Sequence, residues 1–121
     1  MTTLSIAEAA ESAGVSAHTL RYYERIGLLE PVERDGGGRR SYSDDDLARV
    51  TFLTKMRATG MPIRDLQRYV ELVRSGQHTS GERRALLEAH RERIRDQLAY
   101  LETCLEMLDL KIDLYRCWES S

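Results

Sequence analysis

The sequence predicts a mainly α-helical protein: a winged helix-turn-helix head with a small β-hairpin wing, then a long coiled-coil dimerisation helix. Three observations predict this fold. Two short segments with helical periodicity are joined by small residues around Gly14. A glycine-rich turn at residues 35–38 separates two short polar arms. The last third of the chain runs for about ten helical turns without proline or glycine. We therefore expect a head at residues 1–76, and a dimerisation helix with a short tail at residues 77–121.

Length, composition and charge argue against several classes of function. The 121-residue chain has no apolar run near the ~20 residues that span a bilayer, and its start lacks the pattern of a signal peptide, so we expect a soluble cytoplasmic protein without membrane contact. The sequence places no nucleophile–base pair, phosphate loop or carboxylate pair, which predicts no enzyme activity and no cofactor. The net charge is −2, and residues 1–78 carry equal numbers of basic and acidic side chains. Any nucleic-acid footprint must therefore come from a local arrangement of arginines.

The first two predicted helices have the layout of a helix-turn-helix. Ser5 and Glu8 have the spacing of a capping box, and the helix that follows should end at Gly14. Ser16 can cap a second helix, expected over residues 16–26. Two short helices with such a tight connection are typical of a helix-turn-helix.

The second helix divides into two faces. Leu20 and Tyr23 lie on one face and suit a core. The other face is polar or aromatic and consists of His18, Arg21, Tyr22 and Arg25. A recognition helix needs this division, because one face packs while the other enters the major groove. Ser16 and Thr19 stand at the helix start, where free backbone N–H groups favour a phosphate. A merely solvated helix face would show the same pattern.

The glycine-rich turn precedes a pair of arginines. Arg39 and Arg40 beside a flexible tip suit a wing that follows a DNA backbone. An isolated pair of this kind would favour a solvated turn, but its place after a helix-turn-helix favours the DNA interpretation. A third helix capped by Ser43 should end at Gly60, and a fourth should begin at Pro62.

The C-terminal segment predicts one long helix. Thr79 and Glu82 have the spacing of another capping box, and the helix should run for roughly 37 residues, about 55 Å. Its apolar residues recur at a first spacing of seven and then at alternating spacings of four and three, which indicates a coiled-coil seam. The seam consists of Leu87, Ile94, Leu98, Leu101, Leu105, Leu108, Ile112 and Tyr115. Such a helix is too long to bury on the head, so we expect a homodimer.

A second apolar stripe follows the distal half of this helix. Its members are Cys104, Met107, Leu110, Leu114 and Cys117. The partner's head or a ligand must cover this stripe. Cys104 and Cys117 are candidates for an effector or thiol site, although cysteines in such positions also serve as core-filling residues. They lie roughly 20 Å apart along one helix, which excludes an intrachain disulfide.

Residues 1–75 closely resemble the head of the mercury-resistance-regulator (MerR) family. The strings that carry the resemblance are "IAEAAESAGVSAHTLRYYERIGLLEP" and "GRRSYSDDDLARVTFLTKMRATGMPI", followed by the capped coiled-coil helix. The resemblance implies DNA contacts in the second helix from Ser16, His18, Thr19, Arg21, Tyr22 and Tyr23. It also implies wing contacts from Arg39 and Arg40, a position for Tyr42 next to the wing, and one for Arg64 at the start of a second wing helix. For Tyr23 the resemblance and the inward periodicity disagree, and both interpretations stand.

The resemblance further implies a transcriptional regulator that binds a pseudo-palindromic promoter operator as a homodimer, usually antiparallel along the long helix. In this family the dimer bends and untwists DNA with an overlong spacer so that RNA polymerase holoenzyme can engage the promoter. We expect no appended effector domain, since none fits within the 121 residues, and the start of the long helix has no thiol. No metal site is therefore expected, and the small-molecule effector is unknown.

The end of the long helix, "LDLKIDLY", resembles a branch associated with aldehyde and thiol stress. That branch usually has a cysteine in the third helix, where this chain has Lys55. The alternative functions are an architectural or recombination-accessory DNA-binding protein, and a protein-interaction dimer that does not touch DNA.

Overall fold

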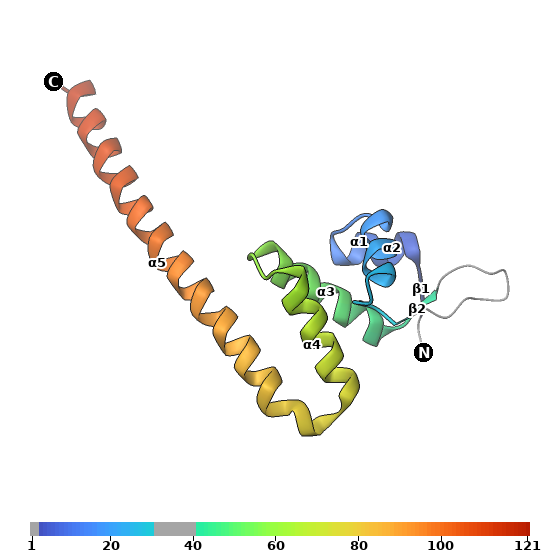
Figure 1. Ribbon diagram of the computed structural model, residues 1–121. Coiled ribbons are helices and arrows are strands. Elements are labelled where there is room, and N and C mark those ends of the chain that lie inside the picture. Colours follow the sequence, from blue (N-terminus) through green and yellow to red (C-terminus); the bar gives the residue numbers. More distant parts are fainter. Residues whose placement is uncertain (1–2, 31–40) are drawn as a thin grey trace. The chain divides into compact units, whose positions relative to one another are not determined.

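The computed structural model describes residues 3–30 and 41–121, and Figure 1 shows a helical chain. The elements in chain order are β1 (Leu4–Ser5), α1 (Ile6–Ala13), α2 (Ala17–Arg25), β2 (Ser41–Tyr42), α3 (Asp44–Ala58), α4 (Ile63–Ser75), the 3-10 turn η1 (Gln77–Thr79) and α5 (Ser80–Glu119). The chain divides into two compact units, residues 1–83 and 84–121, and the first turn of α5 belongs to the first unit. The mainly α fold predicted from the sequence is confirmed.

The two helices of the helix-turn-helix start at the caps, and are separated at the glycine, that the sequence predicts. The Ser5 hydroxyl accepts from the Glu8 backbone N–H at 3.2 Å, and the Glu8 carboxylate accepts from the Ser5 N–H at 3.0 Å. These bonds hold the pKa of Glu8 below its usual value, chiefly because the Ser5 backbone N–H stabilises the carboxylate. Gly14 ends α1 with a φ of 73°, a left-handed conformation that favours glycine. Ser16 then caps α2.

The strand β2 pairs with a segment that the sequence did not indicate, the start of the chain. β1 and β2 pair antiparallel, with Leu4 opposite Tyr42 and Ser5 opposite Ser41. The predicted hairpin turn and its first arm fall at residues 31–40, which lie outside the described residues. A two-residue strand is too short to show an alternating pattern, so the pairing of β2 with the chain start could not be predicted.

The core of the first unit comes from α1, α2, α3 and α4, from β2, and from the loops after α2 and α3. Ser43 caps α3 through a reciprocal bond with Asp46, at 3.2 and 3.0 Å. The buried apolar side chains are Ala9, Ala10, Leu20, Tyr23, Leu28, Leu29, Tyr42, Val50, Leu53, Met61, Leu66, Val70 and Leu72. α2 packs against α1, and the buried Leu20 and Tyr23 on its inner face anchor it in this core, which fixes the direction of its outer face.

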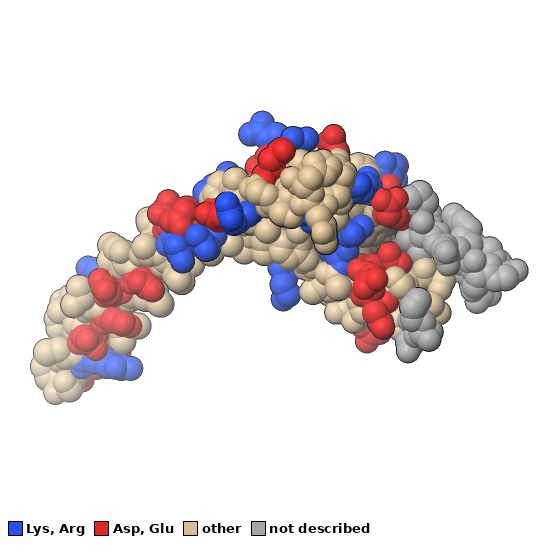
Figure 2. Space-filling model, turned by 90° about the horizontal axis from the view of Figure 1, so that it is seen from below, with Lys and Arg blue, Asp and Glu red and all other residues tan. Residues whose placement is uncertain are grey.

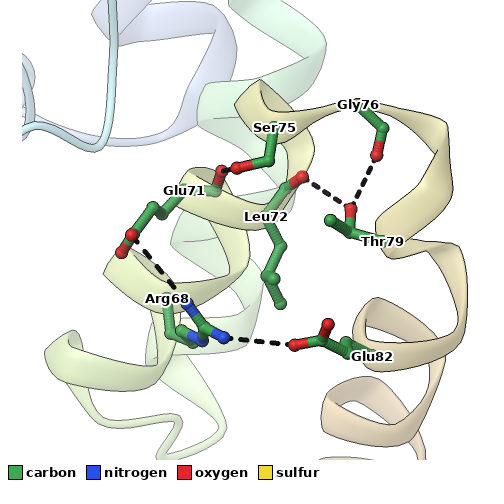
Figure 3. A network of polar contacts seen from close by, with 7 residues as sticks. All are labelled: Arg68, Glu71, Leu72, Ser75, Gly76, Thr79 and Glu82. Carbon is green, nitrogen blue, oxygen red and sulfur yellow. Dashed lines mark hydrogen bonds and ion pairs between the residues drawn. The ribbon is translucent and has the colours of Figure 1, made fainter.

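A buried threonine joins α4 to α5 (Figure 3). The Thr79 hydroxyl lies 2.6 Å from the Leu72 carbonyl oxygen and 2.7 Å from that of Gly76, so its single proton is shared between them. The Thr79 side chain thus points back toward α4, and the predicted capping box with Glu82 is wrong. Glu82 instead accepts from Arg68 on α4 at 3.1 Å. The contact between Glu82 and Arg68 on α4 thus replaces the local contact with Thr79 that the spacing indicated.

Replacing Thr79 with valine should lower the free energy of unfolding by about 1–3 kcal/mol. Valine matches threonine in shape but leaves the carbonyls of Leu72 and Gly76 without the buried hydroxyl donor. Urea unfolding at fixed protein concentration measures this change. Thr103→Val is the matched control, because the Thr103 hydroxyl is exposed and bonds to a carbonyl of its own helix. Equal stability of both variants would show that the buried hydroxyl does not hold the junction.

The second unit is the distal part of α5, a single unbroken helix. Ion pairs along its surface support it, including Arg84 with Glu88 at 3.1 Å and Arg95 with Glu92 at 2.7 Å. The predicted seam residues from Leu98 onward are 45–58% exposed in the single chain. Among the described residues, no helix is both long and apolar enough to cross a membrane.

Candidate nucleic-acid interface

The outer face of α2 is the main candidate surface. Leu20 and Tyr23 are 0% and 4% exposed and anchor the helix in the core. His18 and Arg21 are exposed on the opposite side, and Tyr22 is half-buried between the two faces. The periodicity therefore predicted correctly that α2 has one buried and one exposed face. The exposed polar face is accessible to a ligand.

The start of α2 is ordered by two hydroxyl groups. The Ser16 hydroxyl accepts from the backbone N–H of Thr19 at 3.1 Å and lies 3.0 Å from the Thr19 hydroxyl. This cap satisfies the N–H of Thr19. It leaves those of Ala17 and His18 without a hydrogen-bond acceptor in the part of the chain that the structure describes. An approaching phosphate would meet both N–H groups and the positive end of the helix.

Tyr22 is held by neighbours on its own helix. The Arg25 guanidinium lies 5.5 Å from the centre of the Tyr22 ring, within the range of a cation–π contact. The Tyr22 and Tyr23 ring centres are 6.3 Å apart at an interplanar angle of 45°. Arg25 is thus a positioning residue for Tyr22 as well as a cation on the same face.

The far end of α2 is fixed to α4. Gly27 reverses the chain with a φ of 83°, and the Leu28 N–H donates to the Tyr23 carbonyl at 2.8 Å. The Gln67 side chain donates to the Ile26 carbonyl at 3.0 Å, a bond that spans 41 positions in sequence. Sequence reasoning missed Gln67, because a polar residue on the exposed side of a helix gives no signal of a long-range partner. These bonds fix the angle at which α2 would enter a groove.

The predicted DNA-contacting arginines outside α2 lie on α4 or outside the described residues. Arg64 is exposed in the first turn of α4, and no hydrogen bond or ion pair joins it to the α2 face among the described residues. Arg39 and Arg40 lie outside the described residues.

Two predicted contact residues belong to the core instead. Tyr42 is completely buried, because β2 packs it beneath the small sheet, and its assignment as a DNA contact is corrected accordingly. The burial of Tyr23 decides between its two interpretations in favour of the inward one. Neither ring is part of the candidate surface.

Both acidic and basic side chains lie on the face that Figure 2 shows. This agrees with the balanced charge of the first 78 residues and makes the individual arginines of α2 decisive. Cys104 is half-buried, Cys117 is exposed, and both are free thiols. Within residues 3–30 and 41–121, no cluster of three or more histidine, cysteine or acidic side chains could hold a metal ion.

Comparison with known proteins gives matches along most of the chain. Residues 4–73 match the profile of MerR HTH family regulatory proteins, and residues 47–110 match a profile described as MerR, DNA binding. An uncharacterized HTH-type transcriptional regulator of Haemophilus influenzae is 38% identical over 114 residues, which cover 94% of this chain and 84% of the relative.

Two solved structures are similar in sequence and in fold. HiNmlR, a MerR family regulator lacking the sensor domain, was solved bound to promoter DNA. It has a TM-score of 0.85 and 37% identity, over 95% of this chain and 91% of that one. A Listeria monocytogenes structure assigned to the MerR family of transcriptional regulators has a TM-score of 0.85 and 42% identity, over 93% of this chain and 85% of that one.

Proposed function

Because the chain belongs to the MerR HTH family of regulatory proteins, we propose that it is a sequence-specific DNA-binding transcriptional regulator that acts as a homodimer on a pseudo-palindromic promoter operator. The observation that carries this proposal is the outer face of α2, where exposed His18 and Arg21 project from a helix anchored by buried Leu20 and Tyr23. The promoter-bound structure of HiNmlR supports it at 37% identity.

Each group on this face has a chemical role. The Arg21 guanidinium can donate two parallel bonds to O6 and N7 of a guanine, and His18 can reach a base edge or a phosphate. The Tyr22 hydroxyl and the start of α2, with Ser16 and Thr19, are suited to phosphate oxygens. Arg64 on α4 adds a phosphate contact. By the family resemblance, Arg39 and Arg40 follow the backbone beside the recognition helix.

The dimer follows from the α5 seam. Leu98, Leu101, Leu105 and Leu108 are each more than half exposed in a single chain, at 56–58%. A second α5 lying antiparallel would cover these side chains and place one head at each end of the pair. Two heads related by a two-fold axis require an operator with the same symmetry.

Regulation would work through DNA shape. We propose that the dimer bends and untwists an overlong promoter spacer, so that RNA polymerase holoenzyme engages both promoter elements, in response to an unknown small-molecule effector. Such distortion costs on the order of several kcal/mol, which phosphate contacts from both heads would offset. Matches to named transcriptional regulators do not favour the alternative of an architectural or recombination-accessory protein.

Selection of binding sites from random DNA tests the proposal. We expect an inverted repeat whose half-sites are separated by whole helical turns. Circularly permuted fragments that carry this site should migrate in gels as bent DNA when the protein is bound. Recovery of a single unrepeated half-site, or of no preferred sequence, would overturn the proposed mode of binding.

A further inference from the structure

Two side chains on one side of α4 hold the segment that follows the recognition helix. The Gln67 amide donates to the Ile26 carbonyl at 3.0 Å, and the Arg74 Nε lies 2.5 Å from the Glu30 Oε1. Gln67 and Arg74 are seven positions apart, so an α-helix places them on the same side, about two turns from each other. Helix α4 therefore contacts both ends of residues 26–30, which we call the exit segment.

The middle of the exit segment is held by the core without these side chains. Leu28 is completely buried, and Leu29 is 3% exposed. Their backbone N–H groups both donate to the Tyr23 carbonyl, at 2.8 and 3.3 Å. The ion pair between Arg74 and Glu30 lies after this anchored part, at a residue that the core does not bury. It therefore adds a contact at the point where the chain leaves the exit segment.

The Arg74–Glu30 pair is too exposed to be explained by the stability of the fold. The Arg74 side chain is 37% exposed and that of Glu30 is 55% exposed. Such pairs contribute little to the free energy of unfolding, because solvent screens their attraction and both side chains lose freedom. The pair nevertheless restricts direction. Glu30 precedes Pro31, and a residue before proline is limited to extended backbone, so holding Glu30 also fixes how the chain continues.

The chain after Glu30 leads to Arg39 and Arg40, which by the family resemblance follow the DNA backbone. A side chain that is held near its binding position loses less conformational entropy when it binds, so the same phosphate contact gives a higher affinity. Fixing the start of this segment is thus expected to strengthen DNA binding without adding a contact to DNA.

We propose that Arg74 is a positioning residue for DNA binding, which acts through Glu30 on the segment of the predicted wing. The inference rests on the proposed DNA-binding function and extends it to a residue on α4 that does not itself touch DNA. The competing explanation is that Arg74 binds a phosphate directly. The ion pair opposes this explanation, because the Glu30 carboxylate already occupies the guanidinium and cancels the charge that a phosphate would need.

Glu30→Ala separates the two explanations by the sign of its effect. Removing a carboxylate lowers the repulsion of DNA, so a direct contact by Arg74 predicts equal or tighter binding. Positioning predicts weaker binding to DNA of scrambled sequence, by about tenfold, since contacting residues commonly couple by that factor. Titration of fluorescent scrambled duplex at fixed salt measures the affinity. The matched control is Glu88→Ala, which removes an ion-paired carboxylate from the surface of α5 and should leave the affinity unchanged.

The two side chains should also behave as one unit. Arg74→Ala should weaken binding as much as Glu30→Ala, and the double variant should be no weaker than either single variant. Exchange of the charges, Glu30→Arg with Arg74→Glu, should restore the affinity to within about twofold. Arg74→Glu with Glu88→Arg has the same net charge but no restored pair, so it should remain weak. Equal or tighter binding by Glu30→Ala, or no recovery after the exchange, would overturn the proposal.

The salt dependence identifies what the pair positions. Arg74→Ala should make the slope of log affinity against log salt concentration shallower, because fewer phosphates are neutralised. In an Arg39→Ala, Arg40→Ala background, the same substitution should change neither the slope nor the affinity. A further loss of about tenfold in that background would show that Arg74 acts independently of the predicted wing, which contradicts the proposal.

Gln67→Ala is the comparison on the same helix. It removes the contact to Ile26 at the end of α2, so it should reduce the preference for operator over scrambled DNA and leave the salt slope unchanged. Arg74→Ala should change the slope and keep the preference. Identical changes in both variants would show that Arg74 acts through α2 rather than through Glu30, against the proposal.

The measurements on scrambled DNA need no operator, which separates this inference from the proposed function. A wild type that binds operator and scrambled DNA equally would contradict recognition at a promoter, while the effects of Glu30→Ala and Arg74→Ala would still decide the role of the pair. A wild type that binds no DNA would overturn both.

Discussion

Replacing Leu101 and Leu108 with glutamate should convert the protein to monomers and remove operator binding at nanomolar concentrations. Both leucines are 57% exposed in the single chain and lie on the same seam. Burial of one leucine side chain contributes about 1.5–3 kcal/mol, so the four leucines of a dimer contribute roughly 6–12 kcal/mol. A micromolar dissociation constant corresponds to about 8 kcal/mol, so the loss is large enough to abolish the dimer.

Multi-angle light scattering at micromolar concentration measures the mass directly. The matched control is Ala99→Glu with Thr103→Glu, which adds the same two carboxylates to exposed positions of the helix outside the seam. The control should remain dimeric and bind DNA. A dimeric Leu101→Glu, Leu108→Glu variant would show that the seam does not hold the subunits together.

Replacing Arg21 with alanine should weaken operator binding by about 1–3 kcal/mol per half-site and relax the sequence preference there. The guanidinium is exposed at the centre of the outer face of α2, where its two donors can distinguish guanine from other bases. Binding to unrelated DNA should fall much less, because phosphate contacts supply most of that affinity. Titration of fluorescent operator and of scrambled DNA by the same variant measures both affinities.

Two comparisons make this result specific. Arg84→Ala removes an arginine of α5 that is likewise exposed and should leave both affinities unchanged. Arg39→Ala with Arg40→Ala should weaken binding to all sequences alike. It should also make the slope of log affinity against log salt concentration shallower, by about one for each phosphate that is no longer neutralised. If Arg21→Ala behaves like the wing variant, Arg21 binds a phosphate and does not read a base.

Local sequence signals were enough to predict the helices. Ser5, Ser16 and Ser43 mark helix starts because each hydroxyl caps a backbone N–H within its own first turn. Gly14 and Gly27 mark reversals because only glycine adopts a positive φ without strain. Periodicity alone predicted that Tyr23 points inward, whereas the family resemblance implied a DNA contact for the same residue.

Features that depend on contacts distant in sequence could not be predicted. Thr79 has the local spacing of a cap, but it bonds to α4, which the spacing cannot reveal. Gln67 reaches the end of α2 across 41 positions, and β2 pairs with the chain start. The family resemblance placed Tyr42 next to the wing, and thus near DNA, whereas its side chain is buried. The cavity lined by residues of α3, α4 and Arg83 likewise forms only once these two helices and the first turn of α5 are assembled.

The most direct test of sequence-specific recognition is the ratio of two affinities at physiological salt: that for the selected operator and that for a scrambled sequence of equal length and composition. A dimer that reads bases through α2 should bind the operator at least about 10³-fold more tightly. That preference should disappear in the Arg21→Ala variant before general DNA binding does. Equal affinity of the wild-type dimer for both sequences would contradict sequence-specific recognition, and with it the proposed role at a promoter.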